Sequence, residues 1–293
     1  MKNIGLIVKK GSPKATNGFY LILKYLKNRG FNVLVEQENA KDIDFQEYVS
    51  RDTFANESEL LIVLGGDGLF LHGTSLLNRN EVPILGINLG GLGFLTEFDL
   101  EDALDRINEV IDDDYIYEDR MMLQATLHRQ GESIITDQAL NDIVIHRGTS
   151  RRMMDLTLSI NQQFVNVYTA DGLIVTTPTG STAYNLSANG PIAYPALNGL
   201  IINPICSHTL SNRPIVIPDN VKIEISIIEK SMEDHSVLTF DGQRQFDITS
   251  EDTVLVTKSS KFARVILRKD FDYFHLLRSK LNWGAKLKNG DPK

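Results

Sequence analysis

A carboxylate stands inside a glycine-rich turn in the stretch "LIVLGGDGLFLHG". The apolar run Leu60–Leu64 ends at two glycines, and Asp67 follows them directly, before Gly68. Glycines at the end of a strand let backbone N–H groups close around phosphate, which a carboxylate repels. An Asp between glycines is commonly a turn former or a helix N-cap. Alternatively, Asp67 accepts a proton from an alcohol or helps to hold a divalent cation, because phosphoryl transfer needs positioning and charge neutralisation.

A second unusual stretch is "DGLIVTTPTGSTAYNLSANGPIAYP", which runs from Asp171 to Pro195. It begins as a strand, breaks at a Thr-Pro pair, and then gathers hydroxyl side chains at an expected helix start, where backbone N–H groups lack partners. One interpretation is a capped helix with a threonine-rich loop. The other is a binding site for a sugar, a phosphate and a flat base, with Tyr184 as the aromatic contact.

Three shorter features allow two interpretations each. Asn141 and Asp142 stand at the start of a β run, either as a turn before the strand or as an amide and a carboxylate that grip ribose hydroxyls. The stretch "FDGQ" (240–243) is typical of a hairpin turn. The basic pair Arg151-Arg152 either meets phosphate or is ordinary surface charge.

The remaining composition excludes several classes of protein. The net charge of −8 argues against a broad nucleic-acid surface. Cys206 is the single cysteine, so neither an intrachain disulfide nor a cysteine-rich metal site is expected. Both G-x-x-x-x-G-K-[ST] and G-x-G-x-x-G are missing, since Leu71 stands where the latter needs glycine. No stretch approaches 18 apolar residues, so we expect no membrane span and a cytoplasmic protein.

The first hundred residues alternate strand and helix patterns. Strands are predicted at Ile4–Val8, Asn32–Glu36, Leu60–Leu64 and Ile84–Asn88, and helices around residues 19–26, after Gly68, and after Asp99 as N-cap. This alternation predicts right-handed crossovers and a parallel, Rossmann-like sheet. Ligands bind such sheets outside the carboxyl ends of the strands. The turns "GGDG" and "NLGGLG" both fall at such ends, on strands expected to be neighbours.

From about residue 118 the chain predicts a second, all-β domain with a sandwich or layered architecture. Strands are predicted at Met121–Leu127, Ala139–Ile145, Met154–Ile160, Phe164–Tyr168, Leu173–Thr177, Val221–Ile227, Ser236–Phe240, Val254–Thr257 and Ala263–Leu267. The tail "YFHLLRSKLNW" returns to a helical pattern. The expected domains are 1–117 (α/β), 118–270 (β-rich) and 271–293, a tail that packs back on the first domain.

These motifs, in this order, resemble the bacterial NAD kinases, the ATP-NAD kinase family, which phosphorylate the adenosine ribose 2′-hydroxyl of NAD to give NADP. The resemblance runs through "GGDG", "NLGGLGFLTEF", "ND", "DGLIVTTPTGSTAYNLSANGPI", "DGQ" and the tail, nearly the whole chain. GGDG alone is shared with lipid kinases and phosphofructokinases, whereas "TPTGSTAYNLSANGP" is far more specific. The family's fold is an α/β domain followed by a β-rich domain, with the active site between them.

The resemblance implies a role for each matching residue. Asp67 is implied as the general base. The implied nucleotide-binding residues are Gly68, Phe94, Asn141, Asp142, Arg152, Thr169, Asp171, Thr182, Ala183, Tyr184, Asn185, Leu186, Ser187 and Gln243. The resemblance also implies ATP as phosphoryl donor, a divalent cation such as Mg²⁺, and a homodimer or homotetramer in the cytoplasm.

Two positions depart from the family pattern. Asn189 stands where a second glycine is common, and Asn tolerates positive φ better than most residues. Asp142 stands where many relatives have Glu. Two other functions remain open on these residues. A different GGDG kinase acting on a lipid or sugar phosphate explains Asp67 but leaves the hydroxyl-rich loop unexplained. A non-enzymatic NAD(P) sensor would share the binding residues but has no need of Asp67.

Overall fold

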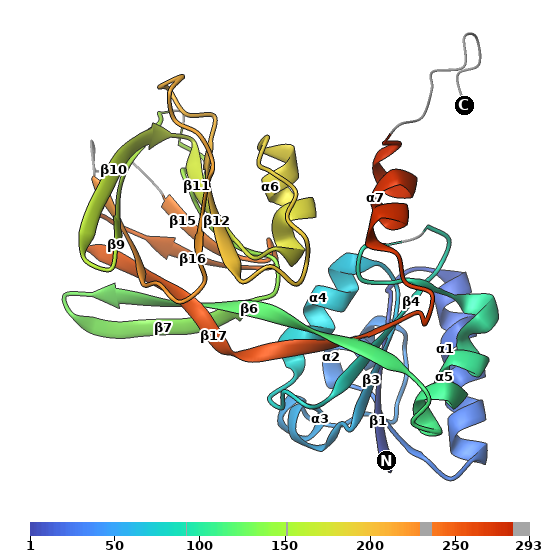
Figure 1. Ribbon diagram of the computed structural model, residues 1–293. Coiled ribbons are helices and arrows are strands. Elements are labelled where there is room, and N and C mark those ends of the chain that lie inside the picture. The colour runs from blue at the N-terminus through green and yellow to red at the C-terminus, as the bar shows by residue number, and fades with distance from the viewer. Residues whose placement is uncertain (92, 151, 229–235, 284–293) are drawn as a thin grey trace. The chain divides into compact units, whose positions relative to one another are not determined.

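The computed structural model describes residues 1–91, 93–150, 152–228 and 236–283 (Figure 1). The chain divides into two compact units. One consists of Met1–Glu118 together with the chain from Arg264 onward, and the other is Asp119–Ala263. The tail helix belongs to the first unit.

The first unit is an α/β unit built on a parallel sheet in the order β2-β1-β3-β4, with β5 and the end of β17 also parallel to β4. Its strands are β1 (Asn3–Val8), β2 (Asn32–Leu34), β3 (Leu60–Leu64), β4 (Pro83–Asn88) and β5 (Phe98–Asp99). Its helices are α1 (Pro13–Asn28), α2 (Gln37–Asp42), α3 (Arg51–Glu57), α4 (Asp67–Leu76), the 3₁₀ turn η1 (Leu100–Asp102), α5 (Ala103–Ile111) and α7 (Tyr273–Leu281). The predicted parallel sheet is confirmed.

Helices cover both faces of this sheet (Figure 1). Alternate strand residues such as Leu6 and Ile62 share a core with α1 and α5. On the opposite face, Gly73 of α4 lies so close to Ile7 and Leu61 that a Cβ there would come within 2.6 Å of the Ile7 side chain. Because both faces are covered, the central strands are apolar along their whole length, which is why they were predictable.

The second unit consists mainly of antiparallel strands. They are β6 (Ile116–Arg129), β7 (Glu132–Ala139), β8 (Asp142–His146), β9 (Met154–Ile160), β10 (Gln163–Ala170), β11 (Gly172–Thr176), β12 (Gly199–Ile205), β13 (Ile215–Pro218), β14 (Ile223–Ile228), β15 (Ser236–Phe240), β16 (Arg244–Ile248) and β17 (Asp252–Leu267). The 3₁₀ turn η2 (Thr179–Thr182) and the short helix α6 (Tyr184–Ser187) interrupt them.

Two sheets of this unit enclose one core. One sheet has the order β13-β12-β11-β8-β15-β16, and the other contains β10-β9-β14-β17 with the β6–β7 hairpin. Side chains from both sheets, such as Ile145 and Leu158, belong to a single buried cluster. The expected sandwich-like β domain is confirmed.

Several local predictions were wrong. The strands β7, β12, β13 and β16 and the helices α2 and α3 were not predicted, and β17 is one long strand where two were expected. Asp99 precedes the turn η1 and makes no side-chain cap bond, so α5 begins only at Ala103. The "DG" hairpin turn is confirmed, because Asp241 and Gly242 have φ of 52° and 63° between β15 and β16.

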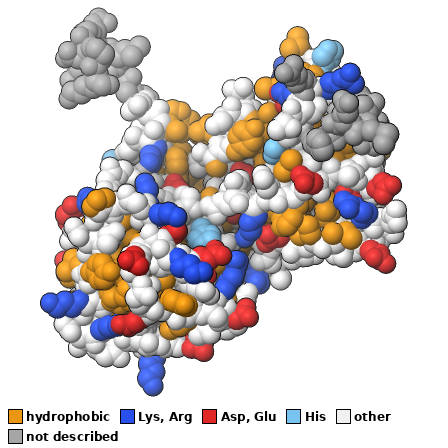
Figure 2. Space-filling model, turned by 180° about the vertical axis from the view of Figure 1, so that it is seen from behind, with side chains coloured by type: hydrophobic (Ala, Val, Ile, Leu, Met, Phe, Trp, Pro, Cys, Tyr) orange, Lys and Arg blue, Asp and Glu red, His pale blue; other side chains and the backbone are white. Residues whose placement is uncertain are grey.

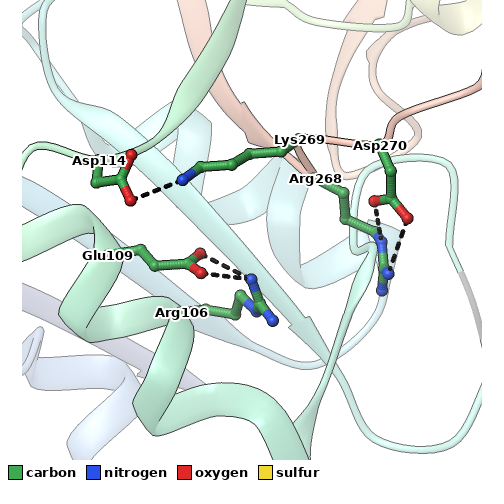
Figure 3. Close-up of polar contacts among 6 residues, drawn as sticks. All are labelled: Arg106, Glu109, Asp114, Arg268, Lys269 and Asp270. Carbon is green, nitrogen blue, oxygen red and sulfur yellow. Dashed lines mark hydrogen bonds and ion pairs between the residues drawn. The ribbon is translucent and has the colours of Figure 1, made fainter.

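Charged side chains of both signs are interspersed over the described part of the face in Figure 2. This agrees with a sequence that has 30 Lys and Arg and 38 Asp and Glu residues. Figure 3 shows this mixture in the first unit, where Lys269 Nζ lies 2.7 Å from Asp114 Oδ2 and Arg268 is paired with Asp270. None of the helices in the described ranges combines the length and apolar character that a membrane span requires.

Candidate functional site

Asp67 lies where β3 ends and α4 begins. Leu64 of β3 pairs with Ile87 of β4, so the turns that follow these two strands are neighbours, as predicted. Gly66 is the N-cap residue of α4 and Asp67 is its first helical residue. The interpretation of Asp67 as a helix N-cap is therefore wrong, although its carboxylate still lies at a helix N-terminus, where backbone amides favour an anion.

The Asp67 carboxylate is held by the second glycine turn. The Phe94 N–H donates to Oδ2 over 2.9 Å, and the Leu95 N–H donates to Oδ1 over 3.0 Å. The Thr96 hydroxyl also donates to Oδ1, over 3.2 Å. Asp67 itself is half-buried, whereas Thr96 is fully buried. These contacts bring together the expected site residues Asp67 and Phe94, with Gly68 beside them on α4.

In the second unit, the Asp241 carboxylate in the hairpin turn is held by backbone donors, as the Asp67 carboxylate is in the first. Three consecutive backbone N–H groups donate to its carboxylate, those of Leu140 and Asn141 at 2.9 and 2.7 Å and that of Asp142 at 3.2 Å. The Asp241 N–H in turn donates to the Asp142 carbonyl at 2.9 Å. The motifs "ND" and "DGQ", a hundred residues apart, therefore form one structure.

Asp142 is a buried carboxyl group with another carboxyl group beside it. Its residue is 4% exposed. Burial, followed by repulsion from Asp241, raises the pKa of Asp142 to about 7. Burial also raises the pKa of Asp241, while its three backbone donors oppose that shift. Because the donors stabilise the charged form of Asp241, Asp142 is the member of the pair that retains a proton near neutral pH.

The hydroxyl-rich turn packs directly against Asn141. The Thr176 hydroxyl donates to the Asn141 carbonyl at 2.8 Å, and the Thr177 hydroxyl donates to the Leu140 carbonyl at 2.7 Å. A Cβ on Gly180 would lie 2.3 Å from the Asn141 carbonyl oxygen, so this position requires glycine. Among the described residues, the buried Asn141 side-chain Oδ1 has no hydrogen-bond partner, which leaves an acceptor for a ligand.

The loop after this turn is stabilised from within by Asn185. This residue is fully buried, and its Nδ2 donates to the carbonyls of Ser181 and Pro191 at 3.1 and 2.9 Å. Its Oδ1 accepts from Asn203 Nδ2 at 3.0 Å. Asn189 has φ of +60°, so the expectation that this position adopts a positive φ is confirmed. Asn185 was expected to bind nucleotide, and the structure gives its side chain a role in shaping the loop.

Tyr184 is an exposed aromatic residue of this loop, with 45% of its surface accessible. Partial burial raises the pKa of its hydroxyl, and Cys206, Asp142 and Asp171 raise it further through their charges. Thr182, Ala183 and Leu186 are half-buried around it, and Ser187 is exposed.

The other expected residues have different surroundings. Arg147 Nε lies 2.8 Å from Asp171 Oδ1, and the Thr169 hydroxyl donates to Asp155 Oδ1 at 2.6 Å. Arg152 is exposed, and its backbone N–H donates to the Ser150 hydroxyl at 3.2 Å. Gln243 is exposed at the end of the hairpin turn. Arg151, the other half of the basic pair, lies outside the described residues.

Sequence reasoning missed Thr96, Gly93, Asp241 and Arg147 as residues that hold the expected site. Thr96 and Gly93 lie inside the quoted "NLGGLGFLTEF", and Asp241 lies inside "DGQ", so the motifs marked the segments without assigning these side chains. Arg147 carried no signal, because its partner Asp171 follows 24 residues later along the chain, in the connection between β10 and β11.

Within the described ranges, no three His, Cys, Asp or Glu side chains gather into a set that could hold a metal ion. The first unit also contains a pocket of about 320 Å³ lined by residues of 97–99 and 268–276, to which none of the expected site residues contributes.

Comparison with known proteins assigns both halves of the chain. Residues 4–115 match the model of the ATP-NAD kinase N-terminal domain, and residues 140–267 match that of the ATP-NAD kinase C-terminal domain. The NAD kinase of Geotalea daltonii is 40% identical over 286 residues, which are 98% of this chain and 100% of that protein.

Solved structures agree with this assignment. Yeast NADH kinase in complex with NADH superposes with a TM-score of 0.91 at 29% identity, covering 99% of this chain and 90% of that one. An NAD kinase from Archaeoglobus fulgidus in complex with ATP has a TM-score of 0.72 at 24% identity, covering 92% of this chain and 94% of that one, and supports the fold.

Proposed function

The chain belongs to the ATP-NAD kinase family, and we propose that it transfers the γ-phosphoryl group of ATP to the 2′-hydroxyl of the adenosine ribose of NAD, with Asp67 as the general base. The protein is an enzyme of the phosphotransferase class. In the proposed reaction the ribose 2′-oxygen attacks the γ-phosphorus in line and forms a new P–O bond. The bond to the ADP oxygen breaks, and the hydroxyl proton passes to the Asp67 carboxylate.

The observation that carries this proposal is the fixed orientation of Asp67 at the start of α4. Three hydrogen bonds from the second glycine turn hold its carboxylate. A positioned carboxylate is what the attacking hydroxyl needs, because phosphoryl transfer depends on orientation more than on covalent chemistry by the protein. The glycine turn 65–68 supplies backbone N–H groups for the phosphates.

We propose that NAD binds in the second unit, at the segments around Asn141, the hairpin turn at Asp241 and the hydroxyl-rich turn. Asn141 offers a buried acceptor that has no partner among the described residues, and Tyr184 offers an exposed ring in the loop that follows the hydroxyl-rich turn. The remaining proposed contacts are Gly68, Phe94, Arg152, Thr169, Thr182, Ala183, Asn185, Leu186, Ser187 and Gln243. Of these, Arg152 and Thr169 rest on the family pattern alone.

We propose that a divalent cation such as Mg²⁺ arrives with ATP. Mg²⁺ in kinases is held largely by substrate phosphates and water, which agrees with the lack of a three-ligand protein cluster in the described ranges. When bound, the cation would neutralise phosphate charge.

The central experiment incubates the purified chain with ATP, Mg²⁺ and NAD and measures NADP by an enzymatic cycling assay. We expect NADP to form only when ATP is present. A parallel reaction with NADH in place of NAD measures the preferred redox form. Binding of NAD without NADP formation above background would contradict the proposal and favour an NAD(P) sensor.

Compartment and assembly form a separate part of the proposal. We propose a cytoplasmic homodimer or homotetramer, on the family pattern and on the single cysteine in the sequence. Light scattering after gel filtration would measure a mass of two or four chains. A mass of one chain would contradict the proposed assembly without affecting the proposed reaction.

A further inference from the structure

We propose that the second glycine turn selects one oxygen of Asp67 as the proton acceptor, with Thr96 and Gly93 as positioning residues. The selected oxygen is Oδ2, and Oδ1 is the anchor. This inference rests on the proposed function, in which Asp67 is the base, and it assigns roles to two residues that contact Asp67 and do not contact the reacting atoms.

The two oxygens differ in how many of their acceptor positions are in use. An ionised carboxylate accepts about four hydrogen bonds, two at each oxygen. Among the described residues, Oδ1 accepts from the Leu95 N–H at 3.0 Å and from the Thr96 hydroxyl at 3.2 Å, which uses both positions. Oδ2 accepts from the Phe94 N–H at 2.9 Å and retains one position. A hydroxyl that approaches Asp67 therefore finds its acceptor at Oδ2.

Thr96 is well suited to act as an anchor. It is fully buried, and its hydroxyl donates to Asp67 Oδ1 because an ionised carboxylate can only accept. The Thr96 carbonyl also accepts from the Gly93 N–H at 3.0 Å, which closes the turn around the carboxylate. The hydroxyl is the only side-chain donor of the three, so it can be removed without altering the backbone.

Gly93 provides the space in which the carboxylate and the hydroxyl meet. A Cβ at this position would lie 2.1 Å from Asp67 Oδ1 and 2.2 Å from Thr96 Oγ1. Gly93 is not among the glycines with positive φ, so glycine is needed here for space and not for backbone conformation. An alanine would push aside the ends of two side chains and leave the backbone free to fold.

The first test removes the anchor with Thr96→Val. We expect kcat to fall about 10-fold with the KM for NAD changed by less than about twofold, because a misplaced reacting group costs rate while substrate binding persists. Thr96→Ser keeps the hydroxyl and should restore kcat to within about twofold of wild type. Thr74→Val is the matched control, since Thr74 is 5% exposed on α4 and its hydroxyl donates to the Phe70 carbonyl at 2.9 Å.

The second test fills the space with Gly93→Ala. We expect kcat to fall about 100-fold, because the carboxylate must move by about an ångström. Gly91→Ala makes the same change in the same turn, where a Cβ would meet no atom within 4 Å, and should cost far less. Thermal melting of each variant shows whether the fold is retained.

A double-mutant cycle makes the inference separable from the base assignment. If Thr96 acts through Asp67, Thr96→Val should change kcat by less than about twofold in the Asp67→Asn background. Equal losses in both backgrounds, or full activity of folded Thr96→Val, would overturn the inference while leaving the proposed function intact. A wild-type chain that makes no NADP would overturn the proposed function itself, and with it the assignment of Oδ2.

Discussion

Asp67 in the first unit and Asp241 in the second are held in the same way but placed differently. From the described residues, each accepts three hydrogen bonds, two at Oδ1 and one at Oδ2. Asp67 stands after the end of a parallel strand and at a helix N-terminus, a position that favours anions in α/β folds. Asp241 stands in a hairpin turn beside a second buried carboxyl group, and burial raises its pKa.

The difference shows that hydrogen bonding alone does not make a catalytic carboxylate. Among the described residues, the donors to Asp241 are the backbone N–H groups of residues 140–142, so we expect Asp241 to shape the turn that carries Asn141. Asp67, by contrast, receives one side-chain donor, Thr96. The comparison therefore predicts that Asp67 controls kcat and that Asp241 controls substrate binding.

The largest expected effect is that of Asp67→Asn on kcat. Loss of a general base costs about 10²–10⁴-fold, and we expect about 10³-fold with the KM for NAD nearly unchanged. The Asn amide N–H₂ would also face the Phe94 N–H, donor against donor, so the second glycine turn shifts as well. Steady-state kinetics measures both constants. Wild-type kcat in this variant would end the assignment of Asp67 as base.

The next effect concerns Asp142 and depends on pH. Its pKa of about 7 in the folded protein lies well above the usual value, because of burial and the charge of Asp241. Between about pH 4 and pH 7 the folded state keeps a proton that the unfolded state has lost, so stability falls as pH rises through this window. Asp142→Asn removes this dependence.

We therefore expect Asp142→Asn to gain stability relative to wild type between pH 5 and pH 8, by about 2–4 kcal/mol. Thermal melting across this range measures the gain. Asp137→Asn is a comparison for an acidic residue that is ion-paired with Arg244 and more exposed. A stability difference between Asp142→Asn and wild type that stays constant with pH would show that Asp142 is ionised throughout this range. It would contradict the raised pKa of Asp142 beside Asp241.

The predictable parts of the molecule were those whose pattern is local. The strands β1, β3 and β4 are apolar throughout because both faces of their sheet are covered. The "DG" turn was predictable because Asp-Gly suits two consecutive residues with positive φ. The two glycine turns were placed on neighbouring strands by the rule that parallel crossovers bring successive strand ends together.

The missed strands have physical reasons. β13 and β16 are the edges of their sheet, where polar residues are tolerated and the apolar alternation weakens. β12 contains Pro204, which argues against a central strand, yet it pairs on both sides. β17 carries the polar run 258–261 in its middle, so it was divided in two.

The missed site residues could not be predicted from the local sequence, because their contacts join distant parts of the chain. The bond from Phe94 to Asp67 spans 27 residues, and the bonds to Asp241 span about a hundred. Which backbone N–H groups face a carboxylate depends on strand register and on the path of the loops, and the sequence does not encode either locally. The motifs therefore located the segments, and the structure was needed to pair them.

A smaller effect is expected for Asp241→Asn. The amide keeps two of the three contacts at its oxygen, while its N–H₂ cannot accept from the Leu140 N–H. We expect the KM for NAD to rise about 10-fold, equivalent to one hydrogen bond, with kcat changed less. Steady-state kinetics of both variants should show mainly a lower kcat in Asp67→Asn and mainly a higher KM for NAD in Asp241→Asn. Equal losses of kcat in the two variants would remove the distinction between them.

The smallest effect tests whether the loop around Tyr184 depends on Asp241 at all. The loop is held by its own Asn185 and closes through Asn189, whose φ is +60°. Asn tolerates this left-handed conformation and alanine does not, so Asn189→Ala should destabilise the chain by about 1 kcal/mol, while Asn189→Gly stays within about 0.5 kcal/mol. Thermal melting measures both variants.

Because Asn189 makes no contact with the Asp241 turn among the described hydrogen bonds, the loss should be the same in the Asp241→Asn background. A loss that changes there would mean that the loop and the hairpin turn fold as one unit.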